Sequence, residues 1–391
     1  MKLAKRLQRI EEPQTIKMAK LSRELRAQGK DIIDLSLGEP DFATPSHIVE
    51  AAIQAMNDGY TKYPPVAGYP ELRSAICTKL LRDNQLNYTP AEVMVSTGAK
   101  QCIANAMLSL VDPGDEVLVP SPYWVTYADL VKLSEGKVVK IPATIENDFK
   151  ITPTQLEEAI TERSKVFIFS SPCNPTGSVY SYEELEALAS VFAKFPNLYI
   201  ISDEIYEYIN FVGKHSSLAS FASIRDRVII INGLSKGYAM TGWRLGYMAA
   251  NASIISACEK LQGQFTSGPN SITQRAAIVA LTGDMNPTLE MQKAFRERRD
   301  FVVAGLRAIK GMQVNTPPGA FYVFPEISQL LGKHSVNTSE ELCMYILEHA
   351  GVSCVSGEAF GDAHCIRISY ATSMDKLQVA IQRLQQLFAN W

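Results

Sequence analysis

The sequence Asn232-Gly-Leu-Ser-Lys236-Gly-Tyr-Ala-Met-Thr-Gly-Trp-Arg244-Leu-Gly-Tyr247 begins where a strand is predicted to end. The four residues before it, 228–231, are all apolar, which is typical of a strand buried on both faces, and the Asn-Gly pair interrupts that run. Lys236 therefore lies at the exit of a buried strand. Most loop lysines are solvated at the surface, but a poorly solvated lysine can lose its charge and attack a carbonyl carbon. Other parts of the sequence are needed to distinguish a solvated surface lysine from a reactive one.

Strands and helices alternate along the middle of the chain, which favours an α/β fold with a mainly parallel sheet covered on both faces. The predicted strands are 93–96, 116–119, 137–141, 165–169, 198–201 and 228–231. The predicted helices between them are 100–110, 123–133, 154–161 and 181–195. Residues 244–250 follow Lys236 with no room for a crossover helix, so they are expected to form an antiparallel strand, the seventh of the sheet.

The pattern of predicted helices and strands changes after about residue 285. Residues 286–310 predict one long helix with a charged face, and the remainder predicts short strands mixed with helices. We expect a large domain of residues 46–285, and a smaller α+β domain formed by residues 1–45 together with 286–391.

Composition excludes several classes of function. With 38 basic and 41 acidic residues the net charge is −3, which does not indicate a nucleic acid or an anionic membrane as partner. No apolar run approaches the roughly 18 residues of a membrane span. The seven cysteines show no zinc-binding spacing, so we expect reduced thiols and no metal. The basic N-terminal segment 1–10 lacks an apolar signal core, and a cytoplasmic protein is predicted.

Polar motifs follow four of the predicted strands, at the edge of a parallel sheet where ligands bind. These motifs are Thr97-Gly-Ala-Lys100, Ser171-Pro-Cys-Asn174-Pro-Thr-Gly177, Ser202-Asp203-Glu-Ile-Tyr206 and Ser235-Lys236. Each alone has an ordinary explanation: Asn-Pro-Thr-Gly is a common turn, and Asp203 could cap a helix. The chain has no complete P-loop and no Gly-x-Gly-x-x-Gly, so nucleotide and dinucleotide binding are not supported.

Together, in this order, the motifs resemble those of class I aminotransferases, and most closely the bacterial type of aspartate aminotransferase. The resemblance extends from Gly38-Glu-Pro-Asp-Phe42 to Arg367-Ile-Ser-Tyr-Ala371. It implies the fold-type I architecture and the cofactor pyridoxal 5′-phosphate (PLP). It also implies transfer of an amino group between L-aspartate or L-glutamate and a 2-oxo acid by a ping-pong mechanism.

The resemblance assigns the residues around the cofactor ring. Lys236 corresponds to the lysine that holds the cofactor covalently, and Asp203 to the carboxylate that keeps the pyridine nitrogen protonated, so that the ring can withdraw electrons. Tyr206 and Asn174 correspond to the groups that hydrogen-bond the phenolic oxygen of the ring. Trp124 corresponds to the aromatic ring stacked on the cofactor, although by itself it would read as a core aromatic.

The cofactor phosphate is expected at a helix start, on the backbone amides of Ala99 and Lys100. Arg244 would supply the counter-charge, with Ser235 nearby. Many class I members have a hydroxyl three residues before the lysine, where this chain has Gly233, which puts phosphate contacts at that point in doubt.

Two further positions imply a homodimer with shared active sites. Tyr63 resembles the tyrosine that reaches the phosphate from the other subunit, and Ser267 is expected to do likewise.

The substrate's α-carboxylate is assigned by resemblance to Arg367 and the backbone of Gly38. Strand periodicity allows Arg367 to face either the solvent or the site. Lys100 is the candidate for the distal carboxylate, because a cation is unfavourable in the first turn of a helix unless it has another role.

Three alternatives remain open. An aromatic, alanine-type or prephenate aminotransferase would share the fold, but prephenate-active relatives have a basic residue where Glu12 precedes Pro13. A PLP-binding regulator would need a DNA-binding domain, for which residues 1–30 are too short. An inactive ligand-binding relic would not be expected to keep the intact set of Lys236, Asp203, Tyr206 and Arg367.

Overall fold

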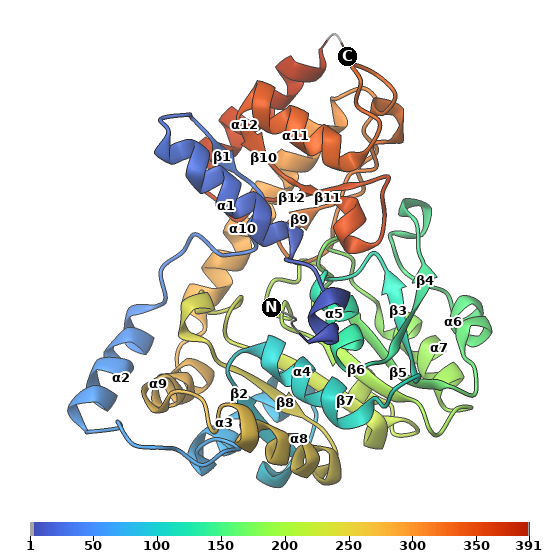
Figure 1. Cartoon of the computed structure of the whole chain (residues 1–391). Helices are drawn as coiled ribbons and strands as arrows, with labels where there is room; N and C mark the ends of the chain where they lie inside the picture. The colour runs from blue at the N-terminus through green and yellow to red at the C-terminus, as the bar shows by residue number, and fades with distance from the viewer. Residues whose placement is uncertain (1–3, 390) are drawn as a thin grey trace.

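The computed structural model describes residues 4–389 and 391; residues 1–3 of the basic N-terminal segment, and residue 390, lie outside the described part. A seven-stranded sheet occupies the middle of the molecule, in the order β2-β8-β7-β6-β5-β3-β4 (Figure 1). Only β8 is antiparallel to its neighbours, as predicted. The strands are β2 (Val93–Ser96), β3 (Glu116–Ser121), β4 (Lys137–Pro142), β5 (Ser164–Ser170), β6 (Tyr199–Asp203), β7 (Val228–Gly233) and β8 (Gly246–Ala249).

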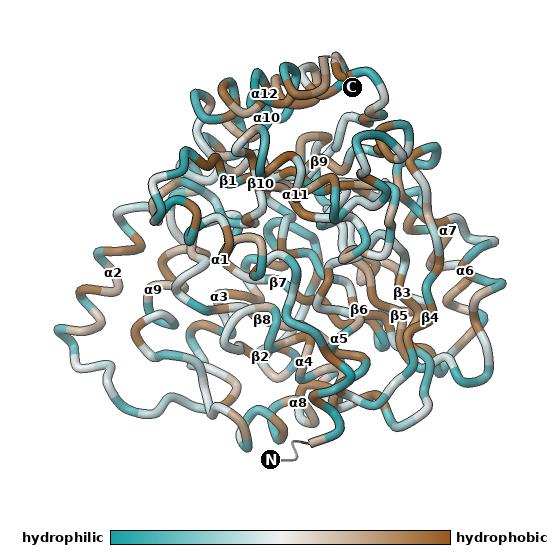
Figure 2. Tube along the Cα trace, turned by 45° about the horizontal axis from the view of Figure 1, so that its top comes forward, coloured by the Kyte–Doolittle hydropathy of each residue, from teal (hydrophilic) through white to brown (hydrophobic). Residues whose placement is uncertain are grey.

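The central strands are apolar throughout because both faces of the sheet are covered. Along β5, Val166 and Ile168 pack into one apolar cluster, whereas Phe167 and Phe169 pack into another on the opposite face. Figure 2 shows these strands as the hydrophobic middle of the molecule. The covering helices are α2 (Ser46–Asn57), α3 (Pro70–Lys79), α4 (Ala99–Leu110), α5 (Thr126–Leu133), α6 (Pro153–Ala159), α7 (Tyr182–Phe192), α8 (Ala252–Phe265) and α9 (Ser271–Thr282).

A third apolar cluster lies among elements from both ends of the chain. The N-terminal β1 pairs in parallel with β10, which places α1 beside the C-terminal elements (Figure 1). β1 has only two residues, because only Ile33 and Asp34 in this segment find a partner strand. The elements are α1 (Gln14–Ala27), β1 (Ile33–Asp34), α10 (Asn286–Arg307), β9 (Tyr322–Val323), α11 (Ser339–Ala350), β10 (Val352–Ser353), β11 (Val355–Ser356), β12 (Ile366–Ser369) and α12 (Met374–Phe388). The domain boundaries at residues 46 and 285 stay a prediction.

One predicted helix starts later than expected, and the difference matters for the site. Helix 123–133 begins only at Thr126, so Trp124 lies in the loop between β3 and α5. A loop position frees the indole from the helix surface and lets it extend over the edge of the sheet.

Candidate functional site

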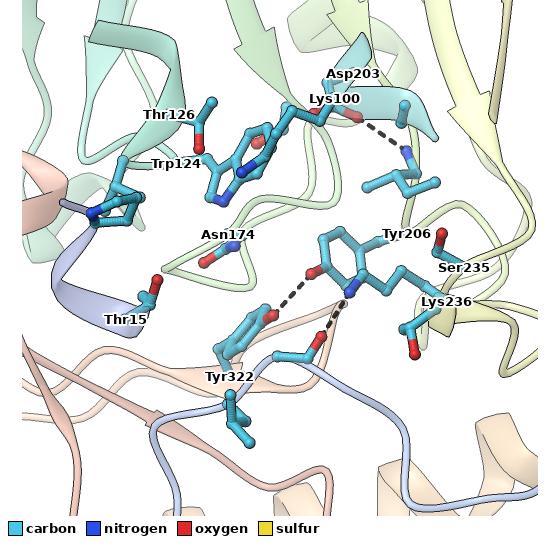
Figure 3. A pocket seen from close by; sticks show the side chains of 18 of the residues that line it. Thr15, Lys100, Trp124, Thr126, Asn174, Asp203, Tyr206, Ser235, Lys236 and Tyr322 are labelled. Atoms are coloured by element: carbon cyan, nitrogen blue, oxygen red, sulfur yellow. Dashed lines mark hydrogen bonds between the residues drawn. The ribbon is translucent and has the colours of Figure 1, made fainter. Parts of the chain in front are cut away.

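The carboxyl ends of four strands meet at one cavity of about 320 Å³. Asn174 follows β5, Asp203 ends β6, Lys236 follows β7, and Ala99 opens the helix after β2. The opposite wall comes from the N-terminal segment and from β9 and β12. Figure 3 shows these side chains around a common space. Eleven of the thirteen predicted site residues line the cavity: Gly38, Ala99, Lys100, Trp124, Asn174, Asp203, Tyr206, Ser235, Lys236, Arg244 and Arg367.

Asp203 is a buried carboxylate at the floor of the cavity. Its side chain accepts hydrogen bonds from the Tyr127 hydroxyl (2.6 Å to Oδ2) and from the Ile205 amide (3.3 Å to Oδ1). No helix begins at this point in the described chain, so Asp203 is not a helix cap. Burial raises the pKa of Asp203 to about 6, although the Tyr127 hydrogen bond works in the opposite direction. A carboxylate held this way is suited to pair with a buried cation.

Lys236 is not a solvated surface lysine. Its Nζ points into the cavity and donates to the Gly38 carbonyl at 2.5 Å (Figure 3). Burial lowers the pKa of Lys236 to about 8, so a substantial fraction of the amine is neutral near physiological pH. A neutral lysine amine is a nucleophile and a base.

Tyr206 lies beside a second tyrosine that the sequence analysis missed. The hydroxyls of Tyr206 and Tyr322 are 2.7 Å apart, and burial raises the pKa of both. Gly38 passes so close that a Cβ there would lie 2.1 Å from the Tyr322 hydroxyl. The sequence gives no indication that Tyr322 and Tyr127 belong to the site, because both are ordinary aromatic residues within predicted core elements. Only the fold brings their hydroxyls to the cavity.

Arg367 lines the cavity, and the residue is only 2% exposed. Nη1 donates to Asn174 Oδ1 (3.0 Å) and Nη2 to the Ser36 carbonyl, while the Tyr322 ring lies 4.5 Å from the guanidinium carbon. Nε is buried without a partner among the described residues, and none of the ion pairs found among them involves Arg367. An anion would stabilise a buried cation that has a free donor, and a carboxylate suits a guanidinium.

The turn from β2 into α4 forms a cradle for an anion. Gly98 has φ +87°, and a Cβ there would lie 2.6 Å from Arg244 Nη2. A Cβ on Gly246 would lie 2.2 Å from the Ala99 amide nitrogen. The two glycines therefore let an arginine and the exposed amides at the start of α4 come together, and the helix N-terminus favours negative charge. The donor set fits a phosphate dianion.

Gly233, at the position where the resemblance to class I members leads us to expect a hydroxyl, does not line the cavity. A Cβ there would lie 2.9 Å from the Gly246 Cα, so β8 leaves no space for a side chain.

The outer rim of the cavity is more polar and more open. Lys100 is exposed, and its Nζ lies 5.0 Å from the centre of the Trp124 ring. Partial desolvation lowers the pKa of Lys100, and the nearby Arg244 cation adds to the effect. Thr15 of α1 and the buried Thr126 of α5 also line the cavity, and neither was predicted (Figure 3).

Tyr63 and Ser267 are not among the residues that line the cavity. Tyr63 is 94% exposed, an unusual state for so large an aromatic ring. The segments that contain Tyr63 and Ser267 are held together by a hydrogen bond, in which Ser271 Oγ donates to the Lys62 carbonyl at 2.8 Å. Their assignment to a neighbouring subunit's site stays a prediction.

No helix in residues 4–389 is long and apolar enough to cross a bilayer. The same described residues contain no group of three or more His, Cys, Asp or Glu side chains arranged to hold a metal ion.

Comparison with known proteins identifies relatives of this chain. The family model for aminotransferase class I and II matches residues 30–384. The aspartate/prephenate aminotransferase of Nitrosomonas europaea is 46% identical over 399 residues, covering 100% of both chains. The aspartate aminotransferase of Bacillus subtilis is 42% identical and covers 99% of this chain and 98% of its own.

Solved structures agree with the sequence relatives. The aspartate aminotransferase from Rhizobium meliloti superposes with a TM-score of 0.95 at 40% identity, covering 98% of each chain. The aspartate aminotransferase from Thermus thermophilus with maleate superposes with a TM-score of 0.94 at 39% identity, covering 99% of this chain and 100% of that one.

Proposed function

Because this chain belongs to the aminotransferase class I and II family, we propose that it moves an amino group between L-aspartate or L-glutamate and 2-oxo acids such as oxaloacetate and 2-oxoglutarate. The reaction is ping-pong and uses PLP. The observation that carries the proposal is the joint lining of one cavity by a lysine amine of lowered pKa, a buried carboxylate and an arginine without a counter-ion.

The residues fit PLP as cofactor. Its phosphate would be held by the amides that open α4, by Arg244 and by Ser235, and its pyridine nitrogen by Asp203. Bound PLP supplies an electron sink for the charge that develops when a proton leaves the substrate's Cα. Lys236 would hold the cofactor, and once released its amine would carry the proton to and from Cα. Tyr206 and Asn174 would donate to the phenolic oxygen, and Trp124 would cover the ring.

The substrate assignment follows from the two cations that face the remaining space. Arg367, with Gly38 beside it, would hold the α-carboxylate, because the guanidinium is buried and has a free donor. Lys100 at the rim would hold the distal carboxylate of aspartate or glutamate. The relative solved with maleate, a dicarboxylate, supports a site for two carboxylates.

A half-reaction assay tests the proposal. The PLP-loaded chain is mixed with aspartate, glutamate, alanine, phenylalanine or arogenate, and the change in cofactor absorbance is followed without a second substrate. Aspartate and glutamate should react fastest. A preference for phenylalanine or alanine would replace the substrate assignment, and a preference for arogenate would favour the prephenate reaction named for the Nitrosomonas relative. No absorbance change with any amino acid would contradict the function.

We also propose that the working unit is a homodimer in which Tyr63 and Ser267 complete the partner's phosphate site. The almost complete exposure of Tyr63 in one chain supports this arrangement. Mixing a Tyr63→Phe variant with a Lys236→Ala variant tests it, since shared sites predict hybrid dimers with one site damaged twice and one intact site. A chain that is monomeric and fully active would contradict the proposal.

A further inference from the structure

A buried polar cluster surrounds Glu204, the residue that follows Asp203 at the end of β6. Glu204 is 1% exposed, and its Oε1 accepts hydrogen bonds from Ser202 (2.9 Å) and Ser217 (2.6 Å). His215 Nε2 lies 3.0 Å from Oε2, with the imidazole 4% exposed. None of these residues lines the cavity, so the proposed reaction makes no direct use of them.

A second buried pair extends the cluster beneath the neighbouring strand. Lys79 Nζ lies 2.5 Å from Glu207 Oε1, and the two side chains are 1% and 3% exposed. Asn232 at the end of β7 donates to the other oxygen of Glu207. The cluster therefore supports both strands whose ends carry the chemistry: β6 with Asp203, and β7 with Lys236 four residues beyond Asn232.

The charges of this cluster balance only if His215 is protonated. Glu204 and Glu207 contribute two negative charges, and Lys79 contributes one positive charge. A buried charge without compensation is strongly unfavourable. Burial works to lower the pKa of His215, but Glu204 and, less strongly, Glu207 outweigh it and raise that pKa, while Lys79 opposes them. The imidazolium is thus the charge that brings the cluster to neutrality.

His215 and Glu204 meet as two groups that can carry opposite charges. Glu204 Oε1 is already satisfied by two hydroxyls, and the contact between His215 Nε2 and Oε2 is close but not aligned as a hydrogen bond. Without the proton on His215, a net negative charge would stand directly beside Asp203 in the chain. Like charges disfavour ionisation, and Glu204 already adds to the burial that raises the pKa of Asp203.

We propose that His215 is a positioning residue of the reaction: its positive charge neutralises Glu204 and thereby keeps Asp203 anionic for the cofactor's pyridine nitrogen. The inference rests on the proposed role of Asp203. It extends the site by two residues, Glu204 and His215, that touch neither the cofactor nor the substrate.

The test measures the equilibrium affinity of the cofactor-free, full-length chain for PLP at several pH values. The affinity of each variant is divided by that of the wild type at the same pH. His215→Gln removes the charge and keeps a donor. Its affinity should be about fivefold weaker near pH 6, because a rise of one unit from a pKa of about 6 lowers the ionised fraction of Asp203 there from about one half to about one tenth. Near pH 9 its affinity should be close to wild type, because Asp203 is ionised in both proteins. Glu204→Gln/His215→Gln removes both charges and should restore wild-type affinity at both pH values. The exposed His364→Gln serves as the matched histidine control and should change nothing.

Each outcome separates this inference from the proposed function. If Asp203→Asn weakens PLP binding but His215→Gln does not, the inference is overturned and the role of Asp203 stands. If Asp203→Asn also has no effect, the role of Asp203 itself fails. A loss of the same size at every pH that the double variant does not restore would make His215 purely structural. Should His215→Gln not fold, a pH-dependent loss in the double variant relative to Glu204→Gln would overturn the proposal.

Discussion

The floor and the rim of the cavity are built in different ways. At the floor, Asp203, Tyr206 and Tyr322 are at most 4% exposed, and each makes a short hydrogen bond to protein. At the rim, Lys100 is exposed, and its Nζ lies 5.0 Å from the centre of the Trp124 ring. The difference separates two tasks. Reaction chemistry needs groups fixed in place and out of water, whereas substrate selection needs a cation that is free to meet an incoming carboxylate.

Removing the amine at the floor should have the largest effect. We expect Lys236→Ala to lower turnover by more than about 10⁴-fold, because one group serves as both covalent anchor and base. PLP should still bind through its phosphate, which absorbance and phosphate analysis of the purified variant would show. Near-normal turnover in this variant would mean that the floor does not carry the chemistry.

Two substitutions of Asp203, at the floor of the cavity, distinguish the contribution of its charge from that of its shape. We expect Asp203→Ala to cost about 10²–10³-fold in kcat and Asp203→Glu clearly less, because the glutamate keeps the negative charge. Steady-state rates for the two variants, with circular dichroism as the control for folding, provide the measurement. Equal rates for both variants would show that packing, and not charge, is what Asp203 contributes.

The sequence predicts the floor and the rim unequally. Lys236, Asp203 and Asn174 were found because each follows an apolar strand, and parallel strands place their ends at one edge. Tyr322 and Tyr127 were missed because their hydroxyls reach the site only through tertiary packing of β9 and α5 against the sheet.

At the rim, Lys100 was found through an unfavourable helix position. Thr15 was missed, since nothing in a helix sequence tells where the helix will lie. The antiparallel β8 followed from loop length alone, whereas the two-residue β1 depends on a partner more than 300 residues away.

Lys100 tests whether the rim selects the substrate. We expect Lys100→Ala to weaken aspartate and glutamate by about 1.5–3 kcal/mol, the range for a hydrogen bond to a charged group, and to leave alanine and phenylalanine nearly unchanged. Values of kcat/KM for the four amino acids provide the comparison. An equal drop in kcat/KM for all four amino acids would mean that Lys100 serves the cofactor and not substrate selection. The rim and the floor would then not differ in task.

The smallest expected effect concerns Tyr127, which supports the floor without facing the substrate. Its hydroxyl donates to Asp203 and works to lower a pKa that burial raises to about 6. Tyr127→Phe removes that donor, so the pKa of Asp203 should rise further, and Asp203 should lose its charge at a higher pH than in the wild type. The loss in kcat/KM should therefore be greatest below about pH 6 and fade as the pH rises. It should stay within about tenfold, since one hydrogen bond contributes about 0.5–1.5 kcal/mol and the Ile205 amide remains. A pH profile of kcat/KM for the variant and the wild type measures both features. A loss that is constant across pH would mean that Tyr127 only fills space beside Trp124.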